Sequence, residues 1–197
     1  MYEQVLAAGA RTANVYFNLG NAWFKAGEPG RAVAAYRHAQ QFDPRDSDLL
    51  ANLEFVRKKT GAEEKPALWM RIVRFLTPNE WAAIAALSFW SLFAVLALGE
   101  VQPKRKLRGT LYVTALLTVL FGAGTGGAVY DALVLRHGVV VAREAPVRFG
   151  PLLDSQVAFQ LADGAEIVIT DSKGDWLQVR DAAGRRGWIK QSEVSPL

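Results

Sequence analysis

Two long apolar runs dominate the hydropathy pattern of the chain, at residues 81–99 and 111–130. Neither run contains a charged residue. Each has roughly the length that a helix needs to cross a hydrocarbon core of about 30 Å. The loop between them, residues 100–110, contains four cations. The pattern therefore predicts a transmembrane hairpin with a soluble segment at each end.

Residues 1–60 follow the periodicity of amphipathic helices. Two helices are expected on either side of Gly27–Gly30, because Pro29 suits the first position of the second helix. A third helix is expected at Ser47–Lys59, with Asp46 as its N-cap. Small residues should let the first two helices approach closely. The residues expected on their contact faces are Tyr16, Leu19, Gly20, Trp23, Ala32, Tyr36 and Ala39.

The same stretch resembles a tetratricopeptide repeat, whose two helices share a pattern of large, small and aromatic positions over about 34 residues. One period after Leu19 lies Leu53, and one period before Tyr36 lies Tyr2. The first helix of the earlier repeat is missing, and no signal peptide precedes it. We therefore expect that Met1 is not the true start, that the chain is a fragment, or that a partner covers the exposed edge. The matching residues are Tyr16, Leu19, Gly20, Trp23, Ala32, Tyr36, Ala39 and Pro44.

This resemblance implies a peptide-binding groove lined by the first helix of each repeat. By position in the repeat, Asn21 and Asn52 match the asparagines that hold a ligand's backbone or C-terminal carboxylate in clamp-type members. The lysine that such clamps use one turn earlier is replaced by Phe17, which does not support carboxylate capture. The alternative is that the asparagines are solvated or form hydrogen bonds between helices. The candidate groove residues are Asn18, Asn21, Phe24, Lys25 and Asn52.

Residues 61–80 contain a short linker and an amphipathic stretch in which Arg71 and Arg74 share one side. A stretch of this kind is suited to the headgroup region of a membrane. Thr77 and Glu80 have the spacing of a capping box, which predicts a sharp start for the first span. Aromatic residues are expected in the interfacial belts of the membrane. They are Trp81, Tyr112 and Tyr130.

Glycines in the second run match a dinucleotide-binding fingerprint between Gly122 and Gly127. That motif requires a short strand before it, whereas a long apolar run precedes it here. The spacing of Gly122 and Gly126 instead predicts close packing of membrane helices. Positive charge near the spans controls orientation, so we expect the 100–110 loop in the cytoplasm and both soluble segments outside. The loop cations are Lys104, Arg105, Lys106 and Arg108.

Residues 136–197 switch to a period of two, with five short β-type runs separated by glycine turns. Five strands in a segment of this length suggest a compact barrel. The order of motifs resembles a bacterial SH3 domain. The residues that carry this resemblance are Arg148, Gly150, Pro151, Leu161, Gly164, Gly174, Trp176, Val179, Gly184, Gly187, Trp188 and Ile189.

Two tryptophans, Trp176 and Trp188, are the candidate residues of an SH3 ligand surface. The alternative is that both belong to the core of the barrel. Some bacterial SH3 domains bind cell-wall peptides, and many are protein-interaction modules.

Charge and composition exclude several classes of function. The net charge is +4, but its strongest cluster is the inter-span loop, where a topogenic role accounts for it better than nucleic-acid binding does. The chain has no cysteine, which excludes disulfides, thiol nucleophiles and cysteine-based metal sites. His38 and His137 have no acid or serine at a catalytic spacing, so we expect neither enzymatic activity nor a cofactor or metal. The acids on turns, Asp171, Asp175 and Asp181, are expected to be solvated.

The order of these parts resembles the BatE proteins of bacterial aerotolerance operons. The resemblance implies an inner-membrane protein that works with MoxR-type AAA ATPases and von Willebrand factor A-type membrane proteins. The residues alone predict a multidomain membrane protein that binds protein partners; a peptidoglycan sensor is the second hypothesis. The expected parts are an all-α tetratricopeptide region at 1–60, a linker and interfacial segment at 61–80, transmembrane helices at 81–99 and 111–130 joined by the basic loop 100–110, and an all-β SH3-like small barrel at 136–197.

Overall fold

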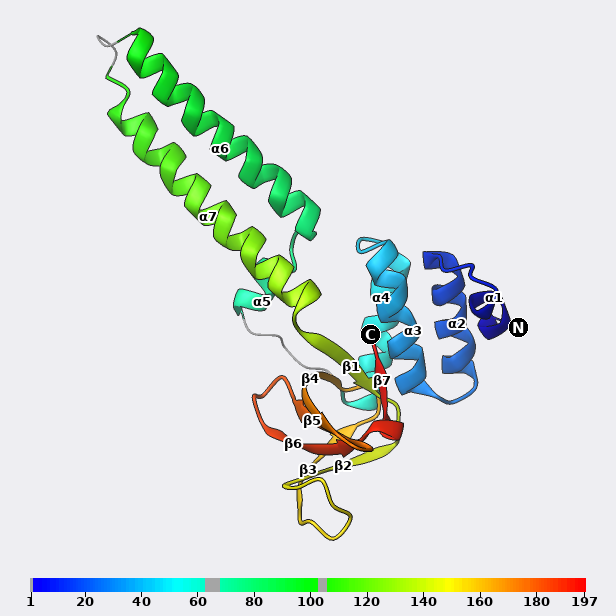
Figure 1. Ribbon diagram of the computed structural model, residues 1–197. Coiled ribbons are helices and arrows are strands. Elements are labelled where there is room, and N and C mark those ends of the chain that lie inside the picture. The colour runs from blue at the N-terminus through cyan, green and yellow to red at the C-terminus, as the bar shows by residue number, and fades with distance from the viewer. Residues whose placement is uncertain (1, 63–67, 103–105) are drawn as a thin grey trace. The chain divides into compact units, whose positions relative to one another are not determined.

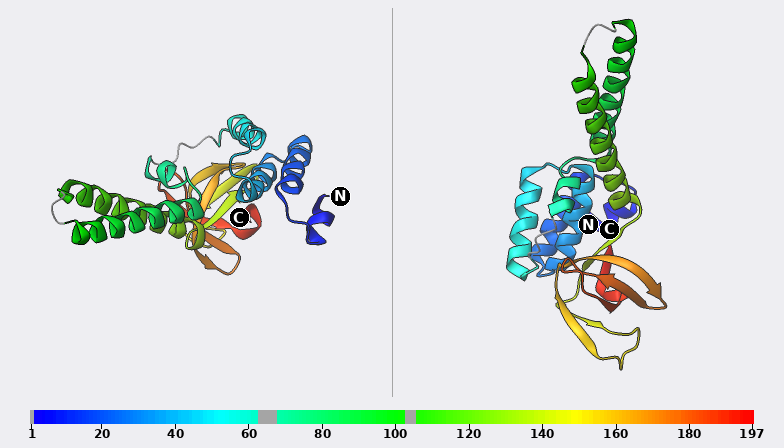
Figure 2. Two further views of the ribbon diagram at one scale, coloured as in Figure 1. Left: turned by 90° about the horizontal axis from the view of Figure 1, so that it is seen from above. Right: turned by 90° about the vertical axis from the view of Figure 1, so that its left-hand side faces the viewer.

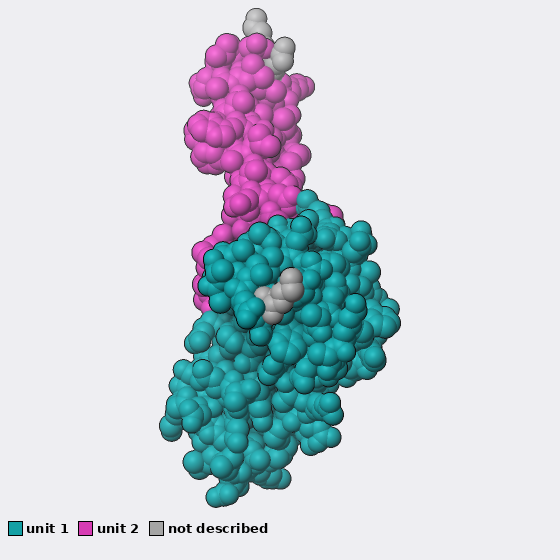
Figure 3. Space-filling model, turned by 90° about the vertical axis from the view of Figure 1, so that its right-hand side faces the viewer, with its two compact units in different colours: residues 1–65, 136–197 teal, residues 66–135 magenta. Residues whose placement is uncertain are grey.

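The computed structural model describes residues 2–62, 68–102 and 106–197, without the side chain of Trp69. These residues form two compact units (Figure 3). The first unit joins the two ends of the chain, residues 1–65 and 136–197, and the second is residues 66–135. The predicted loop cations Lys104 and Arg105 lie outside the described residues.

Four helices open the first unit: α1 (Tyr2–Ala7), α2 (Ala13–Lys25), α3 (Pro29–Phe42) and α4 (Ser47–Thr60). Local signals set their ends. Pro29 occupies the first turn of α3, and the Asp46 carboxylate accepts the backbone N–H of Asp48 at 2.9 Å. The predicted start of the third helix and its cap are therefore confirmed. Helices α2, α3 and α4 lie side by side (Figures 1 and 2).

The contact between α2 and α3 depends on a glycine. A Cβ added at Gly20 would lie 2.5 Å from the ring of Tyr36, so only glycine admits this ring. Tyr36, Ala32 and Ala39 are buried, together with Leu49 and other apolar residues of α3 and α4. The close approach expected from the small residues is confirmed.

The second unit contains the short helix α5 (Leu68–Val73) and the long helices α6 (Pro78–Val101) and α7 (Arg108–Leu133). Thr77 and Glu80 form both halves of the predicted capping box. Helices α6 and α7 lie against each other (Figure 2), and each is long and apolar enough to cross a membrane. At the N-terminal end of α6, the side chain of Arg74 is bound to Asp131 at 2.9 Å.

One expectation about this hairpin is corrected. The glycine that meets a neighbour closely is Gly124, where an added Cβ would lie 2.5 Å from the ring of Trp81, whereas Gly122 and Gly126 face open space. Trp81 is buried, and its indole N–H donates to the carbonyl of Val73 at 2.8 Å. The bulky indole reaches across to α7, so the helix needs a small residue opposite it rather than at the GxxxG positions.

The C-terminal part forms one antiparallel sheet with the order β3-β2-β6-β5-β4-β1-β7. Inward side chains from every strand meet in one cluster with Ala62, so the sheet curls around a single core. The predicted β-runs are present, but a corner at Ala142–Arg143 divides the first, and the last ends in a separate strand. The strands are β1 (Arg136–Val140), β2 (Glu144–Arg148), β3 (Val157–Ala162), β4 (Glu166–Lys173), β5 (Trp176–Arg180), β6 (Arg186–Lys190) and β7 (Val194–Pro196).

The helices and the sheet belong to one unit because β1 is buried on both faces. Val140 points into the core of the sheet, while its neighbour Val139 joins the core of the helices. Helix α3 packs on β1 and β7 (Figure 1). The two ends of the chain, expected as separate soluble arms, thus form one body.

Candidate functional site

The predicted groove asparagines lie together on α2 and α4 but bond internally. The Tyr36 hydroxyl donates to Asn21 Oδ1 at 2.7 Å, and Asn52 Nδ2 donates to the same oxygen at 3.1 Å. Burial raises the pKa of Tyr36, and a hydrogen bond with Asn52 partly offsets this effect. The geometry corresponds to the inter-helix alternative, in which the two asparagines order the helices.

The other predicted groove residues lie on the solvent side of this network. Asn18 and Lys25 are exposed. Phe24 makes an edge-on contact with Phe55 at 5.7 Å between ring centroids, and the ammonium of Lys59 lies 4.9 Å from the Phe24 ring. Phe55 itself is 58% exposed. The helical region therefore presents an aromatic and basic surface to solvent, built from α2 and α4.

A cleft that the sequence did not predict lies between α2, α3 and the last strand. Its volume is about 350 Å³. Tyr16 stacks on His38 at 5.1 Å, and the guanidinium of Arg31 lies 4.7 Å from the Trp23 ring. Burial lowers the pKa of His38, while the backbone of Pro196 acts in the opposite direction. The helical periodicity predicted the position of each aromatic residue on its helix, but it did not indicate that β7 would form the opposite wall of the cleft.

Charged groups hold α3 and α4 against the sheet. Arg37 and Arg57 both form ion pairs with Glu166 at the start of β4, and the Arg37 Nε–Glu166 Oε1 distance is 2.9 Å. Nearby, the turn that contains Asp163 meets the N-terminus of α3 at Gly30. Burial raises the pKa of Asp163, and the backbone N–H of Gly30 lowers it in part.

Beyond its contact with α3 and α4, the outer face of the sheet is not covered by any helix that the structure describes. In β5 and β6 the core residues Leu177, Val179 and Ile189 point inward, so the alternate residues point outward. The register pairs these outward residues across the two strands. We call this surface the open strip: Trp176 opposite Lys190, Gln178 opposite Trp188, and Arg180 opposite Arg186.

Both predicted ligand tryptophans therefore lie on the open strip rather than in the core cluster. Trp176 and Trp188 occupy neighbouring rows, and both are half-buried. Arg148 of β2 is the partner of Trp188 on its other side. Its guanidinium donates to the Ser155 carbonyl at 2.6 Å. The structure thus groups the tryptophans with cations on one face.

One acid expected to be solvated is buried. Asp181, in the turn after β5, is 5% exposed. It accepts the backbone N–H of Arg185 at 2.8 Å and its Nε at 2.6 Å. The carboxylate orders the turn from within, which is a structural role. Across the described residues, no group of three or more His, Cys, Asp or Glu side chains is arranged to hold a metal ion.

The comparisons with known proteins identify one part of the chain. No curated protein matches it. Residues 141–196 match the family described as the bacterial SH3 domain. The match begins after β1, the strand that contacts the helices, and it contains the whole open strip. Such a domain suggests a protein-binding or peptidoglycan-binding role. The C-terminal sheet that presents Trp176 and Trp188 to solvent is therefore a bacterial SH3 domain.

Proposed function

We propose that the protein is a non-enzymatic, membrane-anchored interaction adaptor of the bacterial envelope. The observation that carries the proposal is the packing of the helical region and the bacterial SH3 domain into one unit, while the apolar hairpin is inserted between them in the sequence. A hairpin of two spans returns the chain to the side from which it entered. Both ends of the chain are then on the same side of the membrane, where they can pack into one soluble unit.

The resemblance to BatE proteins adds the finer part of the proposal. In it, residues 1–60 are a tetratricopeptide-type module, and the partners are von Willebrand factor A-type membrane proteins and MoxR-type ATPases acting in stress or aerotolerance. The exposed aromatic and basic surface of α2 and α4 offers the docking site, with Asn18 and Lys25 at its edge. Asn21 and Asn52 act behind this surface by ordering the helices.

Photo-crosslinking in intact membranes tests the adaptor. The chain has no cysteine, so Asn18→Cys and Lys25→Cys can each carry a photoactivatable maleimide at a unique site. We expect both to form an adduct with the same membrane protein. Asp43→Cys, exposed at the end of α3, is the matched control and should form none. Adducts at all three sites, or at none, would contradict the proposal.

The proposed orientation places the soluble unit outside the cytoplasmic membrane and the 100–110 loop in the cytoplasm. Single cysteines at Glu3, Glu144 and Lys106 report on it through a membrane-impermeant maleimide added to intact cells. We expect labelling at positions 3 and 144 and protection at 106. Labelling at 106 with protection at the other two would reverse the orientation.

A second candidate function is a cell-wall sensor, which the bacterial SH3 domain at 141–196 favours. In this case the full chain in detergent should sediment with purified wall sacculi. Trp188→Ala should abolish the sedimentation, because the indole lies on the open strip. Val113→Ala, at an exposed site of α7, is the control. If the wild type stays in the supernatant, the sensor function is excluded.

A further inference from the structure

The open strip contains a charge arrangement that folding alone does not explain. Arg180 and Arg186 are direct cross-strand partners, and like charges at such positions destabilise a sheet. Neither guanidinium makes a hydrogen bond, an ion pair or a ring contact within residues 2–62, 68–102 and 106–197. An anion bound between the two side chains would remove this repulsion.

Two carboxylates of the sheet are already bound by other arginines. Asp181 is bound to Arg185, and Glu166 holds two arginines from the helices. Burial raises the pKa of Glu193, and Lys190 together with Arg148 partly offsets this effect. Trp176 also has an exposed lysine on each side, Lys190 of β6 and Lys173 of β4. The row of Arg180 and Arg186 differs from the other rows because its two cations are direct cross-strand partners.

The three rows of the strip match the repeat of an extended peptide. Alternate residues of a strand are about 6.8 Å apart on one face, so the rows follow one another at that spacing. A peptide lying along the strip would present every second side chain to successive rows. The end row would receive an anion, and the rows of Trp188 and Trp176 would receive apolar groups. Tryptophan and arginine are also the residues enriched at binding hot spots.

We propose that the open strip binds an extended acidic segment of a partner protein. A carboxylate lies between Arg180 and Arg186, and apolar side chains two and four residues away lie against Trp188 and Trp176. The inference rests on the proposed adaptor function and names the chemistry of its partner at the SH3 domain. A wall polymer or lipid surface with evenly repeated anions is the alternative that the tests below distinguish, and the two facing arginines of one row favour a single carboxylate at that row.

The test uses the full chain in detergent and an array of extended dodecapeptides. The peptides place Glu followed at two and four residues by Leu, in every register, and each has a counterpart with Gln in place of Glu. We expect the wild type to bind the Glu peptides and not their Gln counterparts. Added salt should weaken this binding, because an exposed ion pair is screened.

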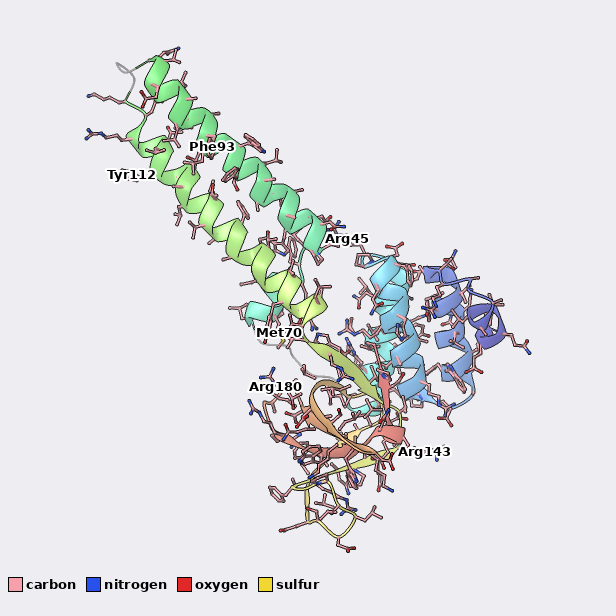
Figure 4. The ribbon with its side chains drawn as sticks, in the orientation of Figure 1. Arg45, Met70, Phe93, Tyr112, Arg143 and Arg180 are labelled. Atoms are coloured by element: carbon pink, nitrogen blue, oxygen red, sulfur yellow. The ribbon has the colours of Figure 1, made fainter. Side chains whose placement is uncertain are left out.

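A matched pair of variants locates the site. Arg180→Gln with Arg186→Gln should weaken binding to the Glu peptides at least tenfold. Arg11→Gln with Arg143→Gln removes two other exposed cations and should change it less than twofold. Figure 4 labels Arg143 and Arg180 on opposite sides of the sheet region. Equal losses from both pairs, or no preference for Glu across the array, would overturn the inference.

Thermal unfolding supplies a second readout that does not need a ligand. Because the two arginines repel each other, Arg186→Gln should raise the Tm of the first unit by roughly 1 to 4 °C. A lower Tm would mean that the pair stabilises the sheet and would count against the inference. Sedimentation with wall sacculi that is lost only in the arginine double variant would assign the strip to the wall polymer instead.

The proposed adaptor function does not depend on this inference being correct. In that case the double variant would lose no affinity for the peptides, while the adducts formed from Asn18→Cys and Lys25→Cys would remain. If the adaptor itself is wrong, those adducts are absent in the wild type as well.

Discussion

The outer face of the sheet is covered by helices along β1, β7 and the start of β4, and it is open along β2, β6 and β5. Both regions use the same alternation of inward and outward residues. They differ in what points outward. In the covered region, Val139 is buried in the core of the helices, and Glu166 forms ion pairs with arginines of the helices. In the open region, two tryptophans point outward together with two arginines that have no partner among the residues the structure describes.

This difference separates charges that hold the fold together from charges that are left for a partner. Around Glu166 each charge has an opposite charge in contact, and the side chains are only 20–25% exposed. On the open strip, like charges face each other at an exposed position. Mutation of the charges around Glu166 should therefore lower stability. Mutation of the arginines on the open strip should weaken binding and change stability little.

The largest effect is expected where the helix and the sheet approach most closely. In Gly30→Ala, the new Cβ would lie 2.5 Å from the carbonyl oxygen of Val140 and would also collide with the Asp163 carboxylate. Backbone cannot yield as a flexible side chain can, so we expect a loss of about 2 to 3 kcal/mol in the free energy of unfolding. Urea unfolding of the full chain in detergent measures it, and amide exchange in α3 and β1 should increase.

The control for this variant is Gly109→Ala on α7. A Cβ there meets nothing within 4 Å, so the unfolding of the first unit should not change. If Gly30→Ala also left the unfolding free energy unchanged, α3 could not pack as closely on the sheet as the structure shows.

A second pair of variants compares the two regions directly. Val139→Ala removes a small side chain that is completely buried under the helices, and we expect a loss of about 2 kcal/mol. Trp188→Phe shortens a partly exposed side chain of the open region and leaves no enclosed cavity, so it should cost about 1 kcal/mol or less. The same urea titrations measure both changes. The reverse order would mean that Trp188 belongs to the core.

The third prediction concerns the carboxylate that links the helices to the sheet. Glu166→Gln removes the carboxylate charge that both Arg37 and Arg57 contact. We expect a loss of about 1 kcal/mol, since a partly buried charged hydrogen bond is worth more than a surface pair. Raised salt should reduce the difference from the wild type. Glu54→Gln, in the exposed pair with Lys58, is the matched control and should have no measurable effect.

Many elements of the molecule could be predicted because their signals are local. The capping box at Thr77–Glu80 and the start of α3 at Pro29 each depend on residues within one turn. The contact of Gly20 with Tyr36 follows from helical spacing on two adjacent helices. The position of Trp188 on the outer face follows from simple alternation beside Ile189.

The covered region could not be predicted in the same way because it joins distant parts of the chain. Arg37 and Glu166 are 129 residues apart, and no periodicity relates them. One signal was present, since the run Val139–Val141 is apolar without alternation, which is typical of a strand buried on both faces. The different roles of Asn21 and Asn18 could not be predicted from the sequence either, because the position of Tyr36 determines which of the two amides forms an internal hydrogen bond.

The smallest effect we expect is a change in how stability depends on pH. Asp163 lies in the covered region, where burial raises its pKa above the ordinary value. The native state therefore keeps this proton to a higher pH than the unfolded chain does. Between the unfolded pKa and the raised native pKa, the native state binds more protons, so the contribution of Asp163 to stability falls as pH rises.

Asp163→Asn removes this contribution, and the Tm of the variant relative to the wild type should increase between acidic and neutral pH. Measuring the difference between the two proteins cancels the other groups that titrate, including Glu193 and His38. If the difference for Asp163→Asn did not change with pH, its carboxylate would have to be solvated, and the turn at Asp163 could not be docked against α3.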